Sequence, residues 1–345
     1  MLSERTIRNL IHLRLPETEV KEILMQLTPE TIDVRSLGLF VDTLRETLDR
    51  PTRDLEGLEN VLDCSGTGGS GLPHFNTSTA AAFVLAAGGL RVAKFGNRAA
   101  TSLSGSFDLL TALGFPLGVE AERVPELLDD QGLVFLYAPS FYPVLARLSA
   151  VRRSLKEKTV FNFLGPLLNP VKPAFRVMGV PDPLMQAVIG RYLSSDNRTR
   201  RAFVVRSADG LDELQPDCDN TVVDIEGGES REFHLAGRLG DAGAPAPSPD
   251  AVPDELLEAL PEALPDAPPA GPEENSEILK RIFSAADSSS VHYRSVCLNA
   301  AAGFVVAGIS ASIEDGAALA SEIIASGAAE RKLADLRRSY AACAS

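Results

Sequence analysis

The chain has 345 residues, of which 45% are hydrophobic, so it is long enough to bury the core of one large or two smaller globular domains. Its formal net charge of −14 disfavours binding to nucleic acid, because a phosphate backbone requires a basic surface. Its four cysteines are scattered, which indicates neither a zinc site nor a disulfide framework.

Residues 1–60 are predicted to form a small helical domain. The segment VKEILMQL (20–27) places apolar residues at i, i+3, i+4 and i+7, which predicts a helix beginning near Glu17. A short helix is expected near Thr31, after Pro29, and another over residues 37–48. The apolar faces of these helices are expected to pack in a core or against a partner chain.

From Val61 onward, short runs rich in β-formers alternate with helical runs. Strands are predicted at LRVAKF (90–95), GLVFLYAP (132–139), 175–179 and 201–205, and helices at DLLTALGF (108–115), PVLARLSAVRRSL (143–155) and 183–193. Such alternation is typical of βαβ units. We therefore predict an α/β fold with a mainly parallel central sheet.

The last third of the chain is predicted to return to antiparallel strands and helices. The segment TVVDIEGGESREFHL (221–235) has two glycines at the centre of a hairpin pattern. Residues 240–272 are rich in Pro, Ala and Asp, which predicts a surface excursion with one short helix near 254–260. Helices are expected at 275–283, 296–305, 312–326 and 330–340, the second of them buried and built of small residues.

No apolar run in the sequence approaches the ~20 residues of a membrane helix, and the N-terminus has no secretory signal. We therefore expect a cytoplasmic protein without membrane or nucleic-acid partners. The expected domains are residues 1–60, with a helical return near 145–175, and a large α/β domain over 61–345.

Residues 63–108 have the composition of a phosphate-binding cradle. Glycines at 66–69 let backbone N–H groups approach an oxyanion, and the Ser/Thr cluster FNTST (75–79) precedes an alanine-rich helix, whose N-terminus attracts anions. Lys94 adds a cation at a strand end, followed by Asn97 and a Ser/Gly tract. The glycines match neither GxGxxG nor the P-loop, so another kind of cradle is indicated.

Two further groups could contribute chemistry. The adjacent carboxylates Asp212 and Glu213 on a loop can bind Mg²⁺, which prefers oxygen ligands and shares them with phosphates. Arg152 can bind a carboxylate through its planar guanidinium, although a surface helix position explains it equally well. His74 lies within the cradle and is interpreted as a loop side chain. No Ser-His-Asp or Cys-His arrangement is present, so no catalytic side chain is assigned.

Six segments resemble the anthranilate phosphoribosyltransferases of tryptophan biosynthesis. They are, in chain order, GTGG (66–69), FNTSTA (75–80), KFGNRAATSLSGSFDLL (94–110), VRRSLKEKTVFNFLGPLLNP (151–170), GLDEL (210–214) and LNAAAGFVV (298–306). The resemblance implies the nucleoside phosphorylase/phosphoribosyltransferase type of fold, with a small helical and a large α/β domain, in a homodimer. It also implies the transfer of the 5-phosphoribosyl group from phosphoribosyl pyrophosphate (PRPP) to anthranilate, with Mg²⁺ as the cofactor and pyrophosphate as the second product.

Carried over residue by residue, the resemblance implies three groups of site residues. The PRPP contacts are expected to be Gly66, Gly69, Ser70, Asn76, Ser78, Thr79, Lys94, Asn97, Ser102 and Ser106. The expected Mg²⁺ ligands are Ser78, Asp212 and Glu213, and the expected contacts to the acceptor are Asn97 and Arg152.

The chain departs from the family pattern at several positions. Ser70 stands where the family usually has Asp, Leu103 where it has Lys, and Phe95 where it has His. The segment APSFYP (138–143) lacks the usual His, so Phe95 and Tyr142 take the places of two histidines of the acceptor channel. One alternative is therefore an enzyme that uses another aromatic carboxylate as acceptor. Another is a non-catalytic binding relative, possible partners including nucleic acid, which the acidic composition disfavours.

Overall fold

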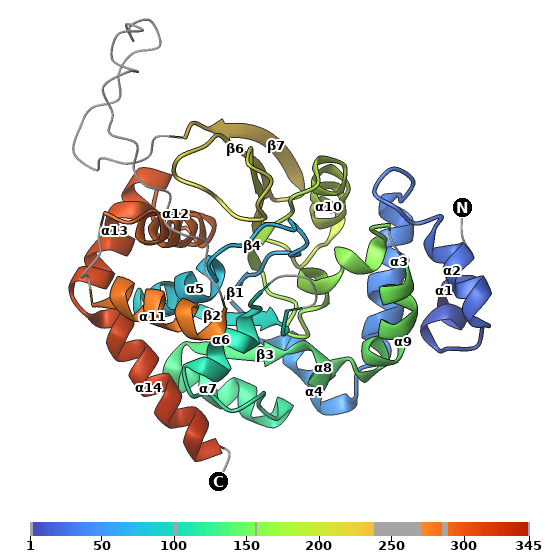
Figure 1. Ribbon diagram of the computed structural model, residues 1–345, viewed down its shortest axis with the longest axis horizontal. Helices are drawn as coiled ribbons and strands as arrows, with labels where there is room; N and C mark the ends of the chain where they lie inside the picture. The colour runs from blue at the N-terminus through green and yellow to red at the C-terminus, as the bar shows by residue number, and fades with distance from the viewer. Residues whose placement is uncertain (1–2, 100–102, 156, 238–270, 285–288, 344–345) are drawn as a thin grey trace, which may run out of the picture.

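The structure is a computed structural model that describes residues 3–99, 103–155, 157–237, 271–284 and 289–343 (Figure 1). In these residues a seven-stranded sheet has the order β3-β2-β1-β4-β5-β6-β7. The strands are β1 (Val61–Cys64), β2 (Arg91–Gly96), β3 (Leu133–Tyr137), β4 (Phe175–Gly179), β5 (Arg201–Ser207), β6 (Asn220–Glu226) and β7 (Glu229–Leu235).

The strand order confirms the predicted α/β class with a mainly parallel sheet. Strands β1 to β5 pair in parallel, whereas β6 and β7 pair antiparallel as the predicted hairpin, with Gly227 and Gly228 at positive φ in its turn. The chain runs outward from β1 through β2 to β3 and then returns to the other side of β1 as β4. Ligands of open α/β sheets bind where the strand order reverses, so the carboxyl ends of β1 and β4 are the expected position of a site.

The helices form two groups on either side of the sheet (Figure 1). One group contains α1 (Glu4–Ile11), α2 (Glu17–Leu24), α3 (Val34–Arg45), α4 (Arg50–Asp54), α8 (Ala138–Phe141), α9 (Pro143–Ser154) and α10 (Pro183–Ser195). The other contains α5 (Thr77–Ala87), α6 (Ser106–Ala112), α7 (Val124–Gln131), α11 (Pro272–Phe283), α12 (Val291–Val306), α13 (Ile313–Ala325) and α14 (Ala328–Cys343). Short 3₁₀ turns lie at Leu55–Gly57, Ala121–Arg123, Val160–Asn162 and Gly165–Leu168.

The segment after α9 contacts the N-terminal helical region through two hydrogen bonds. The Val160 N–H donates to the carbonyl of Leu27 at 2.8 Å, and Arg45 donates through Nη2 to the carbonyl of Leu167 at 2.8 Å. The boundary between the two domains at residue 60 stays a prediction. None of the described helices is both long and apolar enough to cross a membrane.

The prediction of a short helix near Thr31 is wrong. Residues 29–31 form a turn, and α3 begins only at Val34. Asp33 is its N-cap, because the Asp33 carboxylate accepts the Ser36 N–H at 2.7 Å. The Thr31 hydroxyl donates to the carbonyl of Gln26 at 2.9 Å. A threonine side chain that bonds nearby backbone groups in this way competes with helix formation. The short helix predicted near 254–260 lies outside the described residues.

Helices α5 and α12 form the buried centre beside the sheet. Almost every residue of α12 is buried, which confirms the prediction of a buried helix of small residues. A Cβ added to Gly303 would lie 2.6 Å from a side-chain carbon of Leu85, on α5. The absence of side chains at such positions lets the two helices approach closely and places the N-terminus of α5 at the carboxyl edge of the sheet.

Candidate active site

The loop that carries Asp212 lies directly against the glycine loop that follows β1. A Cβ at Gly66 would lie 2.1 Å from Asp212 Oδ2, and a Cβ at Gly179, the last residue of β4, would lie 1.6 Å from the Asp212 carbonyl oxygen. Gly68 and Gly69 have φ of +68° and +79°, a conformation that favours glycine. The glycines therefore permit both the bend of this loop and the close approach of Asp212.

Hydrogen bonds join three distant segments around the two predicted metal ligands. The Gly68 N–H donates to Asp212 Oδ2 at 2.7 Å. Glu213 Oε1 accepts from the Thr77 hydroxyl at 3.0 Å and from Gln215 Nε2 at 2.6 Å. The glycine loop, the first turn of α5 and the Asp-Glu pair thus form one constellation. The sequence prediction did not include Thr77 or Gln215, although Thr77 lies within the Ser/Thr cluster that was singled out.

The electrostatics of this constellation favour a cation near the two carboxylates. Burial raises the pKa of Glu213 to about 7; His74 opposes this shift and Asp212 adds to it. Burial lowers the pKa of His74, but Glu213 and Asp212 together raise it above its ordinary value. Among the described residues, Glu213 Oε2 and Asp212 Oδ1 accept no hydrogen bond. Two such oxygens suit Mg²⁺, which fills its remaining positions with water and phosphate oxygens.

Other protein ligands for a metal are few. Within the described residues, no group of three or more His, Cys, Asp or Glu side chains could hold an ion. Ser78, the third predicted ligand, lies half-buried in the first turn of α5, next to Thr77. A cation at this position would therefore depend on the phosphates of a substrate for part of its coordination.

Asn76 lies at the N-cap of α5, but its side chain bonds elsewhere in the protein. Its Oδ1 accepts from the Ser104 hydroxyl at 2.9 Å and from Asn275 Nδ2 at 3.0 Å, and its Nδ2 donates to the carbonyl of Ser104 at 3.1 Å. The side chain makes no cap bond, which leaves the first turn of α5 open to an anion. Thr79, also a predicted PRPP contact, is fully buried.

Lys94 is placed behind the cradle. Its side chain is only 3% exposed, and its Nζ lies 3.4 Å from the hydroxyl of Ser65. The Ser65 hydroxyl donates to the buried carboxylate of Asp63, which also accepts from Asn169 Nδ2 at 2.9 Å. Burial raises the pKa of Asp63, and Lys94 opposes that shift. In this structure Lys94 thus lies near a buried acid beneath the carboxyl ends of β1 and β2, to which Ser65 connects it.

The second wall of the predicted cradle follows β2. Asn97 is exposed, and its carbonyl accepts from the Ser106 hydroxyl at 3.2 Å. The first wall comprises the glycine loop and the Ser/Thr cluster, residues 66–79, and there the Ser70 hydroxyl accepts the N–H of Leu72 at 3.3 Å. Ser102 lies outside the described residues, and Arg152 belongs to α9 with a side chain that is not described.

Two features around the cradle were not anticipated. Lys158 donates through Nζ to the carbonyl of Gly69 at 2.8 Å, so a cation contacts the glycine loop from the segment after α9. Phe95 and Tyr142 are both buried and pack edge to face, with their ring centroids 6.1 Å apart. The residues that replace the two histidines therefore contact each other inside the protein.

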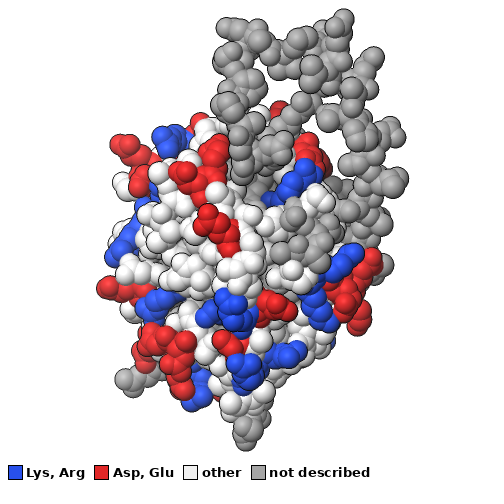
Figure 2. All heavy atoms as spheres, turned by 90° about the vertical axis from the view of Figure 1, so that its left-hand side faces the viewer, with Lys and Arg blue, Asp and Glu red and all other residues white. Residues whose placement is uncertain are grey.

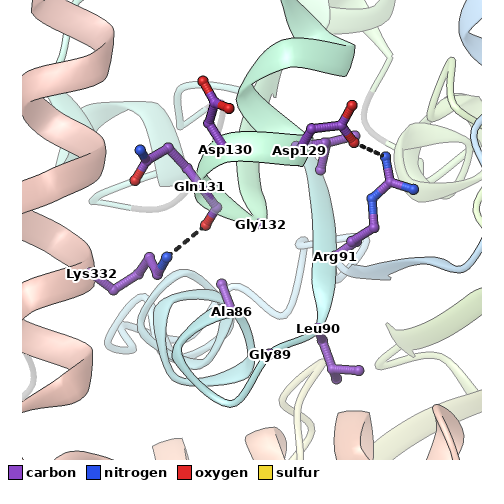
Figure 3. A pocket seen from close by; sticks show the side chains of 10 residues that line it. Ala86, Gly89, Leu90, Arg91, Asp129, Asp130, Gln131, Gly132 and Lys332 are labelled. Carbon is purple, nitrogen blue, oxygen red and sulfur yellow. Dashed lines mark hydrogen bonds and ion pairs between the residues drawn. The ribbon is translucent and has the colours of Figure 1, made fainter.

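A surface pocket lies at the opposite edge of the sheet (Figure 3). It has a volume of about 350 Å³ and is lined by residues at the start of β2, the end of α7 and Lys332 of α14. Its basic groups are paired, because Arg91 contacts Asp129 at 2.8 Å and Lys332 donates to the carbonyl of Gln131 at 2.8 Å. This pocket is not part of the candidate site. On the face that Figure 2 shows, acidic and basic side chains of the described residues are interspersed.

Comparison with known proteins identifies the family. The model of the glycosyl transferase family, a/b domain, matches residues 58–239 and 260–330. An anthranilate phosphoribosyltransferase of Laribacter hongkongensis is 34% identical over 92% of this chain and 86% of its own length. The crystal structure of anthranilate phosphoribosyltransferase from Thermus thermophilus has a TM-score of 0.79 and 34% identity, covering 98% of this chain and 96% of that chain. The enzyme from Saccharomyces cerevisiae, solved in complex with PRPP and Mg, has a TM-score of 0.72 and 27% identity, covering 90% of this chain and 81% of that chain. The chain therefore belongs to the anthranilate phosphoribosyltransferases, enzymes of the glycosyltransferase type.

Proposed function

We propose that this protein transfers the 5-phosphoribosyl group of PRPP to the amino nitrogen of anthranilate in tryptophan biosynthesis, using Mg²⁺ at Asp212 and Glu213. The observation that carries the proposal is the contact of this acidic pair with the glycine loop and with the first turn of α5. In the proposed complex, phosphate-binding and metal-binding groups that lie 136 to 144 residues apart in the chain would face one ligand.

The cradle residues divide by exposure into two roles. We assign direct PRPP contacts to Gly66, Gly69, Ser70, Ser78, Asn97 and Ser106, which are at least partly exposed. Ser102, outside the described residues, stays a contact that the family resemblance alone implies. Asn76, Thr79 and Lys94 are buried, so we assign them to the support of the cradle from behind. Backbone N–H groups and the N-terminus of α5 would stabilise the negative charge that grows on the departing pyrophosphate.

The reaction forms a bond between the amine nitrogen and ribose C1 while the bond from C1 to the pyrophosphate oxygen breaks. Pyrophosphate leaves with the electron pair, and the nitrogen then releases a proton to water. An aromatic amine is a weak nucleophile that needs placement more than deprotonation, which agrees with a site where no general base is assigned. Bound Mg²⁺ would neutralise charge on the leaving group.

An assay that follows the loss of anthranilate fluorescence tests this function. Turnover is expected only when PRPP and Mg²⁺ are both present. Because Phe95 and Tyr142 replace two histidines, hydroxy- and aminobenzoates should be assayed in parallel by pyrophosphate release. Turnover of another aryl acid without turnover of anthranilate would reject anthranilate as the acceptor, and the absence of calorimetric heat from PRPP with Mg²⁺ would reject the enzyme assignment.

We further propose that the protein is a cytoplasmic homodimer. Its four cysteines are all free thiols, which suits a reducing compartment. Light scattering after size-exclusion chromatography should give twice the chain mass of 36.7 kDa.

A further inference from the structure

The two residues that follow the Asp-Glu pair are held by side-chain amides. Leu214 donates its N–H to Asn299 Oδ1 at 3.1 Å, and its carbonyl accepts from Asn299 Nδ2 at 2.8 Å. Gln215 is bound in the same manner by Asn220, with both its N–H and its carbonyl bonded at 2.8 Å. Asn299 thus bonds the N–H and the carbonyl of Leu214, and Asn220 bonds the N–H and the carbonyl of Gln215. A neighbouring β-strand satisfies the backbone of a residue in a similar way.

Both asparagines are anchored in rigid elements. Asn299 is 5% exposed on α12, where its Nδ2 also donates to the carbonyl of Ser295 at 2.9 Å. Asn220 is 1% exposed at the start of β6, and its Nδ2 also donates to the carbonyl of Cys218 at 2.9 Å. In each side-chain amide, the oxygen accepts from a backbone N–H and the nitrogen donates to backbone carbonyls. Rotating the amide by 180° would place donor against donor and acceptor against acceptor, so this orientation is the favoured one.

The hydrogen bonds continue from these amides to the acidic pair. Gln215 donates through Nε2 to Glu213 Oε1 at 2.6 Å, and the Ser295 hydroxyl donates to Gln215 Oε1 at 3.3 Å. Helix α12 therefore contacts both residues that follow the pair. Two adjacent carboxylates repel each other in the absence of a cation, so this loop requires restraint to keep them together.

We propose that Asn299 and Asn220 form an amide clamp that holds the loop of Asp212 and Glu213 in the geometry in which it binds Mg²⁺ with PRPP. Both are positioning residues, since neither touches the acidic side chains directly. The proposal rests on the proposed function for the identity of the ligand. Groups that orient metal ligands change metal affinity by about 10- to 100-fold when they are removed.

The clamp can be tested with the full-length variants Asn299→Ala and Asn220→Ala. A matched control is Tyr340→Phe, because the Tyr340 hydroxyl likewise bonds both the N–H and the carbonyl of one residue, Phe135, at 2.7 and 3.3 Å, but in β3. Three quantities are measured: hydrogen exchange of residues 211–219 without ligand, the apparent Mg²⁺ affinity in PRPP calorimetry, and the melting temperature.

We expect both alanine variants to exchange residues 211–219 at least ~10-fold faster and to bind Mg²⁺ with PRPP ~10- to 100-fold more weakly. The KM for anthranilate should change less than ~2-fold, since the clamp acts on the metal ligands. Tyr340→Phe should lower the melting temperature and leave Mg²⁺ affinity within ~2-fold of the wild type, which separates positioning from general stability.

Unchanged exchange in the variants, or faster exchange with wild-type Mg²⁺ affinity, overturns the clamp. If the wild type itself shows no heat with PRPP and Mg²⁺, the proposed function fails, and the exchange measurement alone decides whether the amides hold the loop. Should an alanine variant not fold, the leucine variant at the same position replaces it, because it keeps most of the side-chain volume and loses both hydrogen bonds.

Discussion

Glu213 is a buried acidic residue, and within the part of the chain that the structure describes it forms no hydrogen bond with a positively charged side chain. It is 8% exposed, and both of its hydrogen-bond donors, Thr77 and Gln215, are neutral. Burial raises its pKa from 4.5 to about 7, with Asp212 contributing in the same direction and His74 opposing. This arrangement costs stability in the metal-free protein, as is common where function requires preorganised charge.

This pKa predicts how stability depends on pH in the metal-free protein. Between pH 4.5 and about 7, Glu213 is ionised in the unfolded chain and protonated in the folded one, so its contribution to the free energy of unfolding falls as pH rises. Glu213→Gln should remove this decrease in the free energy of unfolding. At pH 8 the free energy of unfolding of the variant should therefore exceed that of the wild type by up to about 3 kcal/mol. Urea unfolding with a chelator present, from pH 4.5 to 8, measures the difference, and parallel pH profiles for the two proteins would contradict the assignment.

Arg152 carries the other prediction for a single residue. If its guanidinium binds the carboxylate of the acceptor, Arg152→Ala should raise the KM for anthranilate at least ~10-fold, the loss expected for a charge-assisted hydrogen bond. The KM for PRPP should stay within ~2-fold. Steady-state kinetics with each substrate varied in turn gives both values, and an effect confined to PRPP would place Arg152 at the other substrate.

Among the elements, α11 supports the cradle from behind. Asn275, on α11, donates to the side chain of Asn76 at the start of α5, and Asn76 in turn holds Ser104 in the tract that follows β2. Three segments that are distant in the chain therefore meet at one buried amide. Since this amide links both walls of the cradle, a change on α11 should affect the binding of PRPP without any direct contact.

Asn275→Ala tests this coupling between elements. The variant removes one buried donor to Asn76, which should lower the free energy of unfolding by about 1–2 kcal/mol and weaken PRPP binding several-fold. Ser276→Ala is a suitable control, because the Ser276 hydroxyl bonds, among the described residues, only the carbonyl of Glu273 within the first turn of α11. Calorimetry of PRPP with Mg²⁺ should show weaker binding for Asn275→Ala alone, and equal affinities would refute the coupling.

At the scale of the whole molecule, an aromatic cluster joins the sheet to the helices that position the cradle. Phe83 of α5 has its ring centroid 5.3 Å from that of Phe135 in β3, 5.9 Å from that of Phe283 in α11 and 6.3 Å from that of Phe115. All four rings are buried. The packing of Phe83, about two turns into α5, therefore helps to fix the position of the first turn of the helix.

Phe83→Ala should consequently destabilise the molecule as a unit. The lost burial and the cavity left behind predict a decrease of about 3–5 kcal/mol in the free energy of unfolding. Phe83→Leu, which keeps most of the apolar volume, should cost distinctly less. Thermal or urea unfolding gives both values, and a loss below about 1 kcal/mol for Phe83→Ala would mean that the cluster does not hold α5.

The sequence by itself predicted the parallel sheet, β4 from Phe175 to Gly179, the hairpin at Gly227 and most helices, because periodicity and turn residues act over short distances in the chain. It also singled out the glycine loop, the Ser/Thr cluster and the Asp-Glu pair by composition. It did not predict the turn at Thr31, where side chains compete with the helix for backbone groups.

Only the tertiary structure decided which of these residues are accessible to a ligand and which are buried behind them. Asn76 and Lys94 have the chemistry of phosphate contacts, yet folding buries both against partners from other elements. Asn299 lies in the family-like segment 298–306, yet neither Asn299 nor Asn220 was assigned a role from the sequence, because their partners lie 85 and five residues away on another element or loop. A buried amide's role depends on what long-range packing brings within hydrogen-bond distance, and this information is absent from local sequence patterns.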